Sequence, residues 1–132
     1  MVNTKLKPIL PSLREKKRYL VFEVISQEKI SDFSAVSEMI TRCSLHFMGQ
    51  LDAARAGVMA LGNKWDTNLQ RGIARVGHKH VDDLKSALVF ARKISDKEVI
   101  IRSLGVSGIL KKAENKFFSP SASYRTKFGT SS

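Results

Sequence analysis

The sequence predicts an α+β fold in one domain, and three observations lead to this class. First, 132 residues suffice for one compact domain and are too few for two. Second, hydrophobic residues make up 42% of the chain, which is enough for a buried core. Third, strand-like and helix-like patterns follow one another in the order β-α-β-β-α-β, with one further helix at the end. This order predicts a four-stranded antiparallel sheet with two helices on one face.

The first predicted strand covers residues 19–25 (YLVFEVI), where β-branched and aromatic residues dominate. A helix is predicted from Ser31, a suitable N-cap, to about Met48. Its apolar residues recur every three or four positions and form one buried stripe, namely Phe33, Val36, Ile40, Cys43 and Phe47. Gly49 is predicted to end this helix.

The rest of the chain is predicted to contain three strands and two helices. The strands cover residues 57–65, 71–77 and 99–104, and the helices cover residues 81–94 and 107–118. The helix at 81–94 starts with acidic residues and ends with basic ones, as the helix dipole favours. We therefore expect one domain at residues 17–118, between a basic arm at 1–16 and a flexible Ser/Thr-rich tail at 119–132.

The charge balance points to a polyanionic partner. The 23 Lys and Arg residues outnumber the 12 Asp and Glu residues, which gives a net charge of +11. Such an excess favours phosphate contacts, and charge alone does not separate nucleic acid from anionic lipid. No window approaches the roughly 18 consecutive apolar residues of a membrane span, and the N-terminus lacks the apolar core of a secretion signal. We therefore expect a soluble, cytoplasmic protein with no membrane partner.

The segment Arg71–His78 (RGIARVGH) is similar to a signature on the third strand of RNA-recognition domains, which share the ferredoxin-like order predicted above. The aromatic positions of that signature, on which bases stack, hold Ile73, Arg75 and His78 here. Chance is the alternative explanation for so short a match. Because the segment falls on the correct predicted strand, we expect an RNA-recognition-like fold that binds RNA elsewhere than on this sheet face.

The alternation of side chains places Tyr19, Val21, Ile25 and Ile73 on the sheet face away from the two main helices. An aliphatic face left open to water would be unfavourable and prone to association. We therefore expect a cover, either the terminal helix or a partner protein, and these four residues are the candidates for a partner interface.

Basic residues are the candidates for RNA binding. Any one lysine is more often part of a solvated surface, but together they favour a phosphate-contacting surface. The predicted RNA-binding residues are Lys16, Lys17, Arg18, Arg71, Arg75, Lys79, His80, Lys111, Lys112 and Lys116.

The sequence predicts neither a catalytic residue nor a cofactor or metal held by the protein. His78 and His80 have no third ligand at a suitable spacing except Asp82 and Asp83, which are better explained as helix-start residues. The acidic residues form no cluster suited to a metal-dependent nuclease. The single cysteine, Cys43, lies in the apolar stripe of the first helix and excludes an intramolecular disulfide.

Three segments resemble the ribonuclease P protein component 2 family, an archaeal subunit with a eukaryotic counterpart. They read LREKKRYLVFEVIS, RGIARVGHKHVDDLKSAL and RSLGVSGILKKAENKFF. The resemblance covers roughly residues 13–118, and its most specific element is the Leu104–Gly108 turn before a Lys-rich helix. The segment from Gly49 to Gln70 fits less securely, so no residue roles are carried into it.

This resemblance implies a subunit of the ribonucleoprotein that removes the 5′ leader from precursor tRNA. In that family the RNA carries the active site and binds magnesium, and the protein pairs with component 3, a TIM-barrel-like subunit, in a possible heterotetramer. The precursor tRNA would be reached through the complex. Two alternatives stay open: a stand-alone RNA-binding or ribosomal protein of the same fold, and a metal-dependent nuclease.

Overall fold

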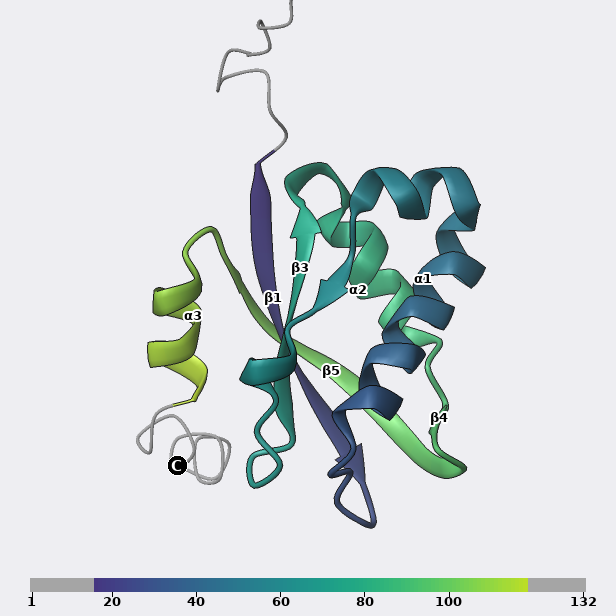
Figure 1. Cartoon of the computed structure of the whole chain (residues 1–132), viewed down its shortest axis with the longest axis vertical. Coiled ribbons are helices and arrows are strands. Elements are labelled where there is room, and N and C mark those ends of the chain that lie inside the picture. The colour runs from purple at the N-terminus through teal and green to yellow at the C-terminus, as the bar shows by residue number, and fades with distance from the viewer. Residues whose placement is uncertain (1–15, 119–132) are drawn as a thin grey trace, which may run out of the picture.

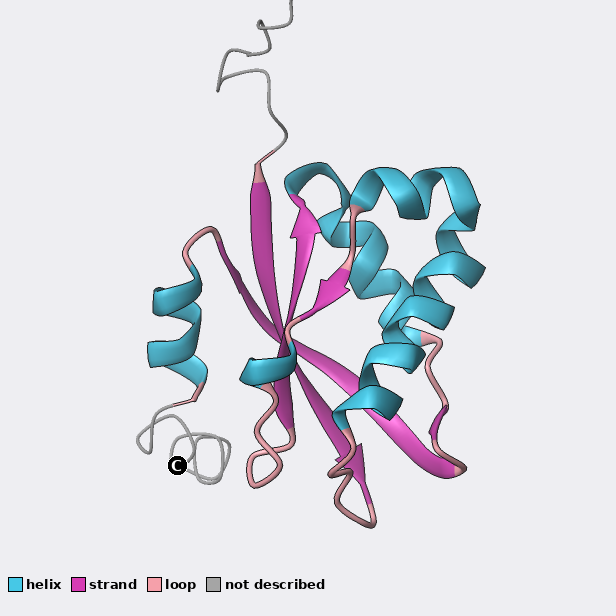
Figure 2. Ribbon diagram, in the orientation of Figure 1, coloured by secondary structure: helices cyan, strands magenta, loops and turns pink. Residues whose placement is uncertain are grey.

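The computed structural model describes residues 16–118, so nearly all of the predicted basic arm and the whole predicted tail lie outside the described residues. A five-stranded antiparallel sheet with strand order β2-β3-β1-β5-β4 forms the centre. Helices α1 and α2 lie on one face of the sheet and α3 on the other (Figures 1 and 2). The predicted fold class is therefore confirmed.

Ten elements follow one another along the chain. They are β1 (Lys17–Ser26), α1 (Phe33–Ala56), β2 (Met59–Ala60), the 3-10 turn η3 (Gly62–Lys64), β3 (Arg71–Gly77), the 3-10 turn η4 (His78–His80), α2 (Val81–Val89), β4 (Lys93–Ile94), β5 (Lys97–Ser107) and α3 (Leu110–Phe117).

The main core lies between the sheet and the helices α1 and α2. Alternate residues of β1 point into it and meet buried apolar residues of the two helices. Full burial of one such side chain stabilises the fold by about 1.5–3 kcal/mol. The largest of these buried residues are Leu20, Phe22, Val36, Met39, Ile40, Leu84 and Leu88.

Helix α1 continues past the point where the sequence predicted its end. Gly49 has non-helical backbone angles (φ 83°, ψ 168°) and kinks the helix, but the helical path resumes as far as Ala56. The cap glycine is Gly57, in the left-handed conformation at φ 61°. At the other end the N-cap is Asp32, whose carboxylate accepts a hydrogen bond from the amide of Ser34, and not Ser31.

Other boundaries also differ from the prediction. β5 covers Lys97–Ser107 and is longer than the predicted strand, so the last helix begins at Leu110 and not at Ser107. The strand predicted at 57–65 is only the two residues of β2, because the chain turns into η3 immediately afterwards. Helix α2 ends at Val89, and Lys93–Ile94 pairs with the start of β5 as a fifth, short strand in place of helix. In the part of the chain that the structure describes, no helix is long and apolar enough to cross a membrane.

Candidate nucleic-acid interface

Helix α3 covers much of the sheet face that faces away from α1 and α2. Val21, Ile73 and Ala113 are buried in a second cluster, against which Phe117 and other partly exposed apolar residues pack. Of the two covers that we expected, the terminal helix or a partner protein, the terminal helix is therefore the one that buries Val21 and Ile73. Tyr19 is half-buried at the same cluster, while Ile25 lies on that face with 46% of its surface exposed. A partner contact stays a prediction for Ile25.

Arg71 is a structural residue in this fold. It is 1% exposed, and its Nη1 donates a 2.7 Å hydrogen bond to the carbonyl oxygen of Phe117, the last residue of α3. Its Nε lies 3.4 Å from Glu23, whose other carboxylate oxygen accepts a 2.7 Å hydrogen bond from Arg102. The prediction that Arg71 contacts RNA does not fit this position, because a guanidinium buried under α3 cannot reach a phosphate.

Six other predicted residues gather at one end of the sheet. There β1 begins and β3 ends: Lys17 pairs with Gly77, and the amide of His78 donates to the carbonyl of Lys16 at 2.8 Å. The turn from β5 to α3 lies at this end too (Figure 1). We call this group the basic end of the sheet; its members are Lys16, Lys17, Arg18, Arg75, Lys79 and His80.

Arg75 differs from Arg71 in how its donors are used. Within the described residues its Nε has no acceptor, although it is buried, and its Nη2 reaches only the thioether sulfur of Met59 at 3.5 Å. A thioether is a weak acceptor. The buried Nε is out of reach of a phosphate, but the end of the guanidinium at Nη2 lies at an exposed contact and keeps hydrogen-bonding capacity that a phosphate could use.

The lysines of α3 follow the basic end directly. Gly108, which precedes α3, lies against Arg18: a Cβ at Gly108 would be 3.3 Å from the guanidinium Nη1. Lys111 and Lys112 are exposed in the first turn of α3, and that turn holds no acidic residue. Cations at a helix N-terminus oppose the helix dipole, so helix stability does not account for these two lysines. Lys116 is also exposed and lies 5.5 Å above the ring of Phe117.

The histidines and the cysteine make local contacts. His78 Nδ1 lies 3.2 Å from the carbonyl of Lys16, and His80 Nδ1 lies 3.4 Å from Asp83. Among residues 16–118 no three His, Cys, Asp or Glu side chains are arranged to hold a metal ion. Cys43 is half-buried on α1, and burial raises the pKa of its thiol.

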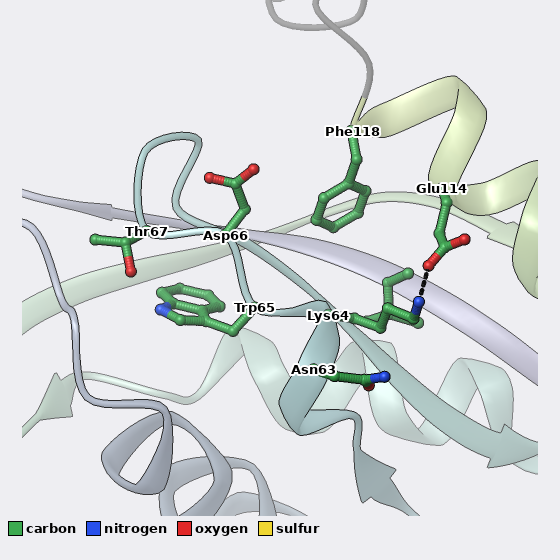
Figure 3. Close-up of a pocket in the computed structure, with 8 residues that line it drawn as sticks. Asn63, Lys64, Trp65, Asp66, Thr67, Glu114 and Phe118 are labelled. Atoms are coloured by element: carbon green, nitrogen blue, oxygen red, sulfur yellow. Dashed lines mark ion pairs between the residues drawn. The ribbon is translucent and has the colours of Figure 1, made fainter.

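A pocket that no sequence pattern predicted lies between the η3 loop and α3 (Figure 3). Its volume is about 350 Å³. The lining residues are Asn63, Lys64, Trp65, Asp66, Thr67, Ile73, Glu114 and Phe118. The one available sequence signal was Trp65, the single tryptophan of the chain, in a polar loop.

Known proteins resemble this chain over most of its length. Ribonuclease P protein component 2 of Pyrococcus abyssi is 38% identical over 115 residues, which cover 87% of this chain and 95% of that protein. The protein of the same name from Methanosarcina acetivorans is 35% identical over 112 residues, covering 85% and 81%. A chain in the cryo-EM structure of yeast ribonuclease MRP superposes with a TM-score of 0.53 at 12% identity, covering 72% of this chain and 76% of that chain, and so shows the fold alone.

The family comparison includes the whole domain that the structure describes except its first two residues. The Rpp14/Pop5 family matches residues 18–118, from the second residue of β1 to the residue after α3. The match therefore contains the basic residues of β3 and α3 and the pocket-lining residues. The chain belongs to the Rpp14/Pop5 family.

Proposed function

We propose that this protein is a non-catalytic subunit of ribonuclease P that assists the catalytic RNA in removing the 5′ leader of precursor tRNA. The observation that carries the proposal is the similarity to proteins named ribonuclease P protein component 2 over 95% of the length of one of them. The basic surface supports it, since a subunit that organises RNA needs phosphate contacts more than it needs an active site.

In this role the basic end of the sheet and the α3 lysines contact RNA backbone. The exposed end of the Arg75 guanidinium contacts only a thioether within the described residues, and Lys111 and Lys112 place charge where the helix itself does not favour it. Magnesium would be bound by the RNA, where it serves the cleavage chemistry. The proposed protein partner is component 3, and the proposed assembly of the two is a heterotetramer. Precursor tRNA binds to the assembled complex in the cytoplasm.

Reconstitution tests the proposal. Catalytic RNA and component 3 are assayed for precursor-tRNA cleavage at a limiting magnesium concentration, with and without this protein. We expect the protein to raise the initial rate, and to be inactive alone. An unchanged rate at saturating protein would contradict the proposal.

Two further outcomes would identify the alternatives. Cleavage by the purified protein alone, abolished by Asp82→Asn or Asp83→Asn, would show a metal-dependent nuclease. Affinity purification that returns ribosomes or mixed RNA, without a long structured RNA and a barrel subunit, would show a stand-alone RNA-binding or ribosomal protein.

A further inference from the structure

The pocket between η3 and α3 is open to the surface and has an aromatic and polar lining. Its volume of about 350 Å³ is at the lower end of the roughly 300–1,000 Å³ that small-ligand pockets occupy, and suits one planar ring system. Trp65 and Phe118 lie on different sides of the pocket (Figure 3). The ion pair between Lys64 and Glu114 closes a third side and ties the loop to α3.

The indole of Trp65 is held in place from outside the pocket. It stacks on Phe22 with ring centroids 6.3 Å apart, and its Nε1 donates to the carbonyl of Ile30 at 3.3 Å. The contacts with Phe22 and Ile30 therefore fix the position of the indole that lines the pocket. A pre-positioned aromatic surface of this kind binds a base with little loss of side-chain entropy.

The pocket lining also contains polar side chains that can form hydrogen bonds with a ligand. Asn63 offers an amide and Thr67 a hydroxyl, so that donors and acceptors are both present. Asp66 is fixed by its own loop: Oδ1 accepts a 3.0 Å hydrogen bond from the amide of Leu69, and its backbone pairs with Arg71. The second carboxylate oxygen of Asp66 adds an acceptor for an N–H group of a base.

The charges around the pocket orient a polynucleotide. Glu114 is neutralised by Lys64, whereas Asp66 would repel a phosphate that entered the pocket. Lys111 lies three positions before Glu114 on the same side of α3, and it is exposed. Negative charge inside and an exposed lysine outside favour a base in the pocket with its phosphates towards α3.

We propose that this pocket holds one unpaired base of RNA, contacted by the indole of Trp65 and the ring of Phe118. The proposal rests on the proposed function, since it specifies how an RNA-binding subunit takes hold of a single-stranded nucleotide. The proposal also accounts for the absence of stacking aromatic residues on β3. In RNA-recognition domains bases stack on this sheet face, but here α3 covers it, so the proposed stacking surface lies beside α3.

Trp65 is the only tryptophan in the chain, so its fluorescence reports on this pocket alone. The full-length protein is titrated with a short single-stranded RNA and with an abasic strand of the same length and charge. Binding is followed in parallel by anisotropy of a label on the strand. We expect both strands to bind, and only the strand that carries bases to quench Trp65 saturably.

Two variants and one matched control locate the effect. Phe118→Ala should weaken binding of the base-containing strand roughly fivefold or more, as removal of a stacking aromatic does, and leave the abasic strand unaffected. Asn63→Ala, at an exposed position, should reduce the quench without affecting folding. Phe90→Ala is the control, because Phe90 is a phenylalanine at the C-cap of α2, as Phe118 is at the C-cap of α3, and Phe90 does not line the pocket.

The outcomes separate this inference from the proposed function. Equal quenching by both strands, or binding with no quench, would overturn the pocket assignment and leave the phosphate contacts of the proposed function standing. A change in Trp65 emission on adding component 3, with none on adding RNA, would assign the pocket to a protein contact and also overturn it. Failure of both strands to bind would contradict both the pocket assignment and the proposed RNA-binding role.

Discussion

Arg71 on β3 donates a 2.7 Å hydrogen bond from Nη1 to the carbonyl oxygen of Phe117 at the end of α3. A cation at the C-terminal end of a helix also interacts favourably with the helix dipole. The same guanidinium faces Glu23, so one buried side chain joins the sheet to the helix that covers it.

Arg71→Gln should destabilise the protein by roughly 3 kcal/mol, because it leaves buried polar groups without their charged partner. The measurement is urea-induced unfolding followed by circular dichroism. Arg102→Gln is the matched control: Arg102 contacts the same Glu23 carboxylate, but 51% of its side chain is exposed, so the destabilisation should stay below about 1 kcal/mol. Equal destabilisation by the two variants would show that Arg71 does not hold α3.

Gly105 permits the close approach of α3 to β5. A Cβ at this position would lie 2.5 Å from Cζ of Phe117, which is too close for any real contact. Gly105→Ala should therefore displace α3 and lower the free energy of unfolding by about 1–3 kcal/mol. Gly108→Ala should change it little, since its Cβ would meet only the flexible side-chain end of Arg18 at 3.3 Å. If Gly105→Ala is neutral, Phe117 is not wedged against the sheet.

The outer lysines of α3 are expected to contact RNA backbone more than bases. Replacing Lys111, Lys112 and Lys116 with Gln should weaken RNA binding for all sequences, and should lower the salt slope by about one for each phosphate that is no longer neutralised. The fold should persist, because exposed changes usually stay within about 0.5 kcal/mol each.

The matched control replaces three exposed lysines near the opposite end of the sheet, where β1 ends and β5 begins, namely Lys29, Lys93 and Lys97. Both variants remove the same charge, so only the location differs. An equal fall of the salt slope in both would mean that net charge, and not the α3 surface, determines binding.

Cys43 should react slowly with thiol reagents. Burial raises the pKa of its thiol, and Arg42 opposes this more weakly. Because the thiolate is the reactive form, the reaction rate of the folded protein should rise only at higher pH than that of the chain in denaturant. A pH–rate profile for disulfide exchange measures this, and identical profiles in the two states would contradict it.

The bounds of two strands, β1 and β3, could be predicted closely because the local sequence determines them. β3 has the bounds that the sequence predicted, and β1 extends the predicted strand by a residue or two at each end. β1 is rich in β-branched and aromatic residues, and β3 is buried over nearly its whole length, as suits strands in the middle of a sheet. Gly49 shows the limit: a glycine at a helix end and a glycine at a kink look alike, and only the packing of the following turn distinguishes them.

The candidate site was predictable in part. The basic end of the sheet joins residues near the start of β1 to residues after β3, and an antiparallel pairing of these strands follows from the predicted order. Arg71 could not be assigned in the same way, because its burial depends on α3, 46 residues further along the chain. The pocket likewise joins the η3 loop to α3, and no local pattern relates those segments.

A substitution at Ile73 tests whether α3 covers this sheet face in solution or whether RNA bases stack on the face. Ile73 is 1% exposed beneath α3, in the cluster with Val21 and Ala113, so Ile73→Asp would place an unpaired charge in an apolar contact and cost several kcal/mol. Because the cover is part of the same chain, the isolated protein should lose thermal stability before any partner is added. Ile25→Asp is the matched control on the same face, where 46% exposure lets the charge reach water. If Ile73→Asp folds with normal stability and loses only RNA binding, α3 leaves the sheet in solution and bases stack on the face that it covers here.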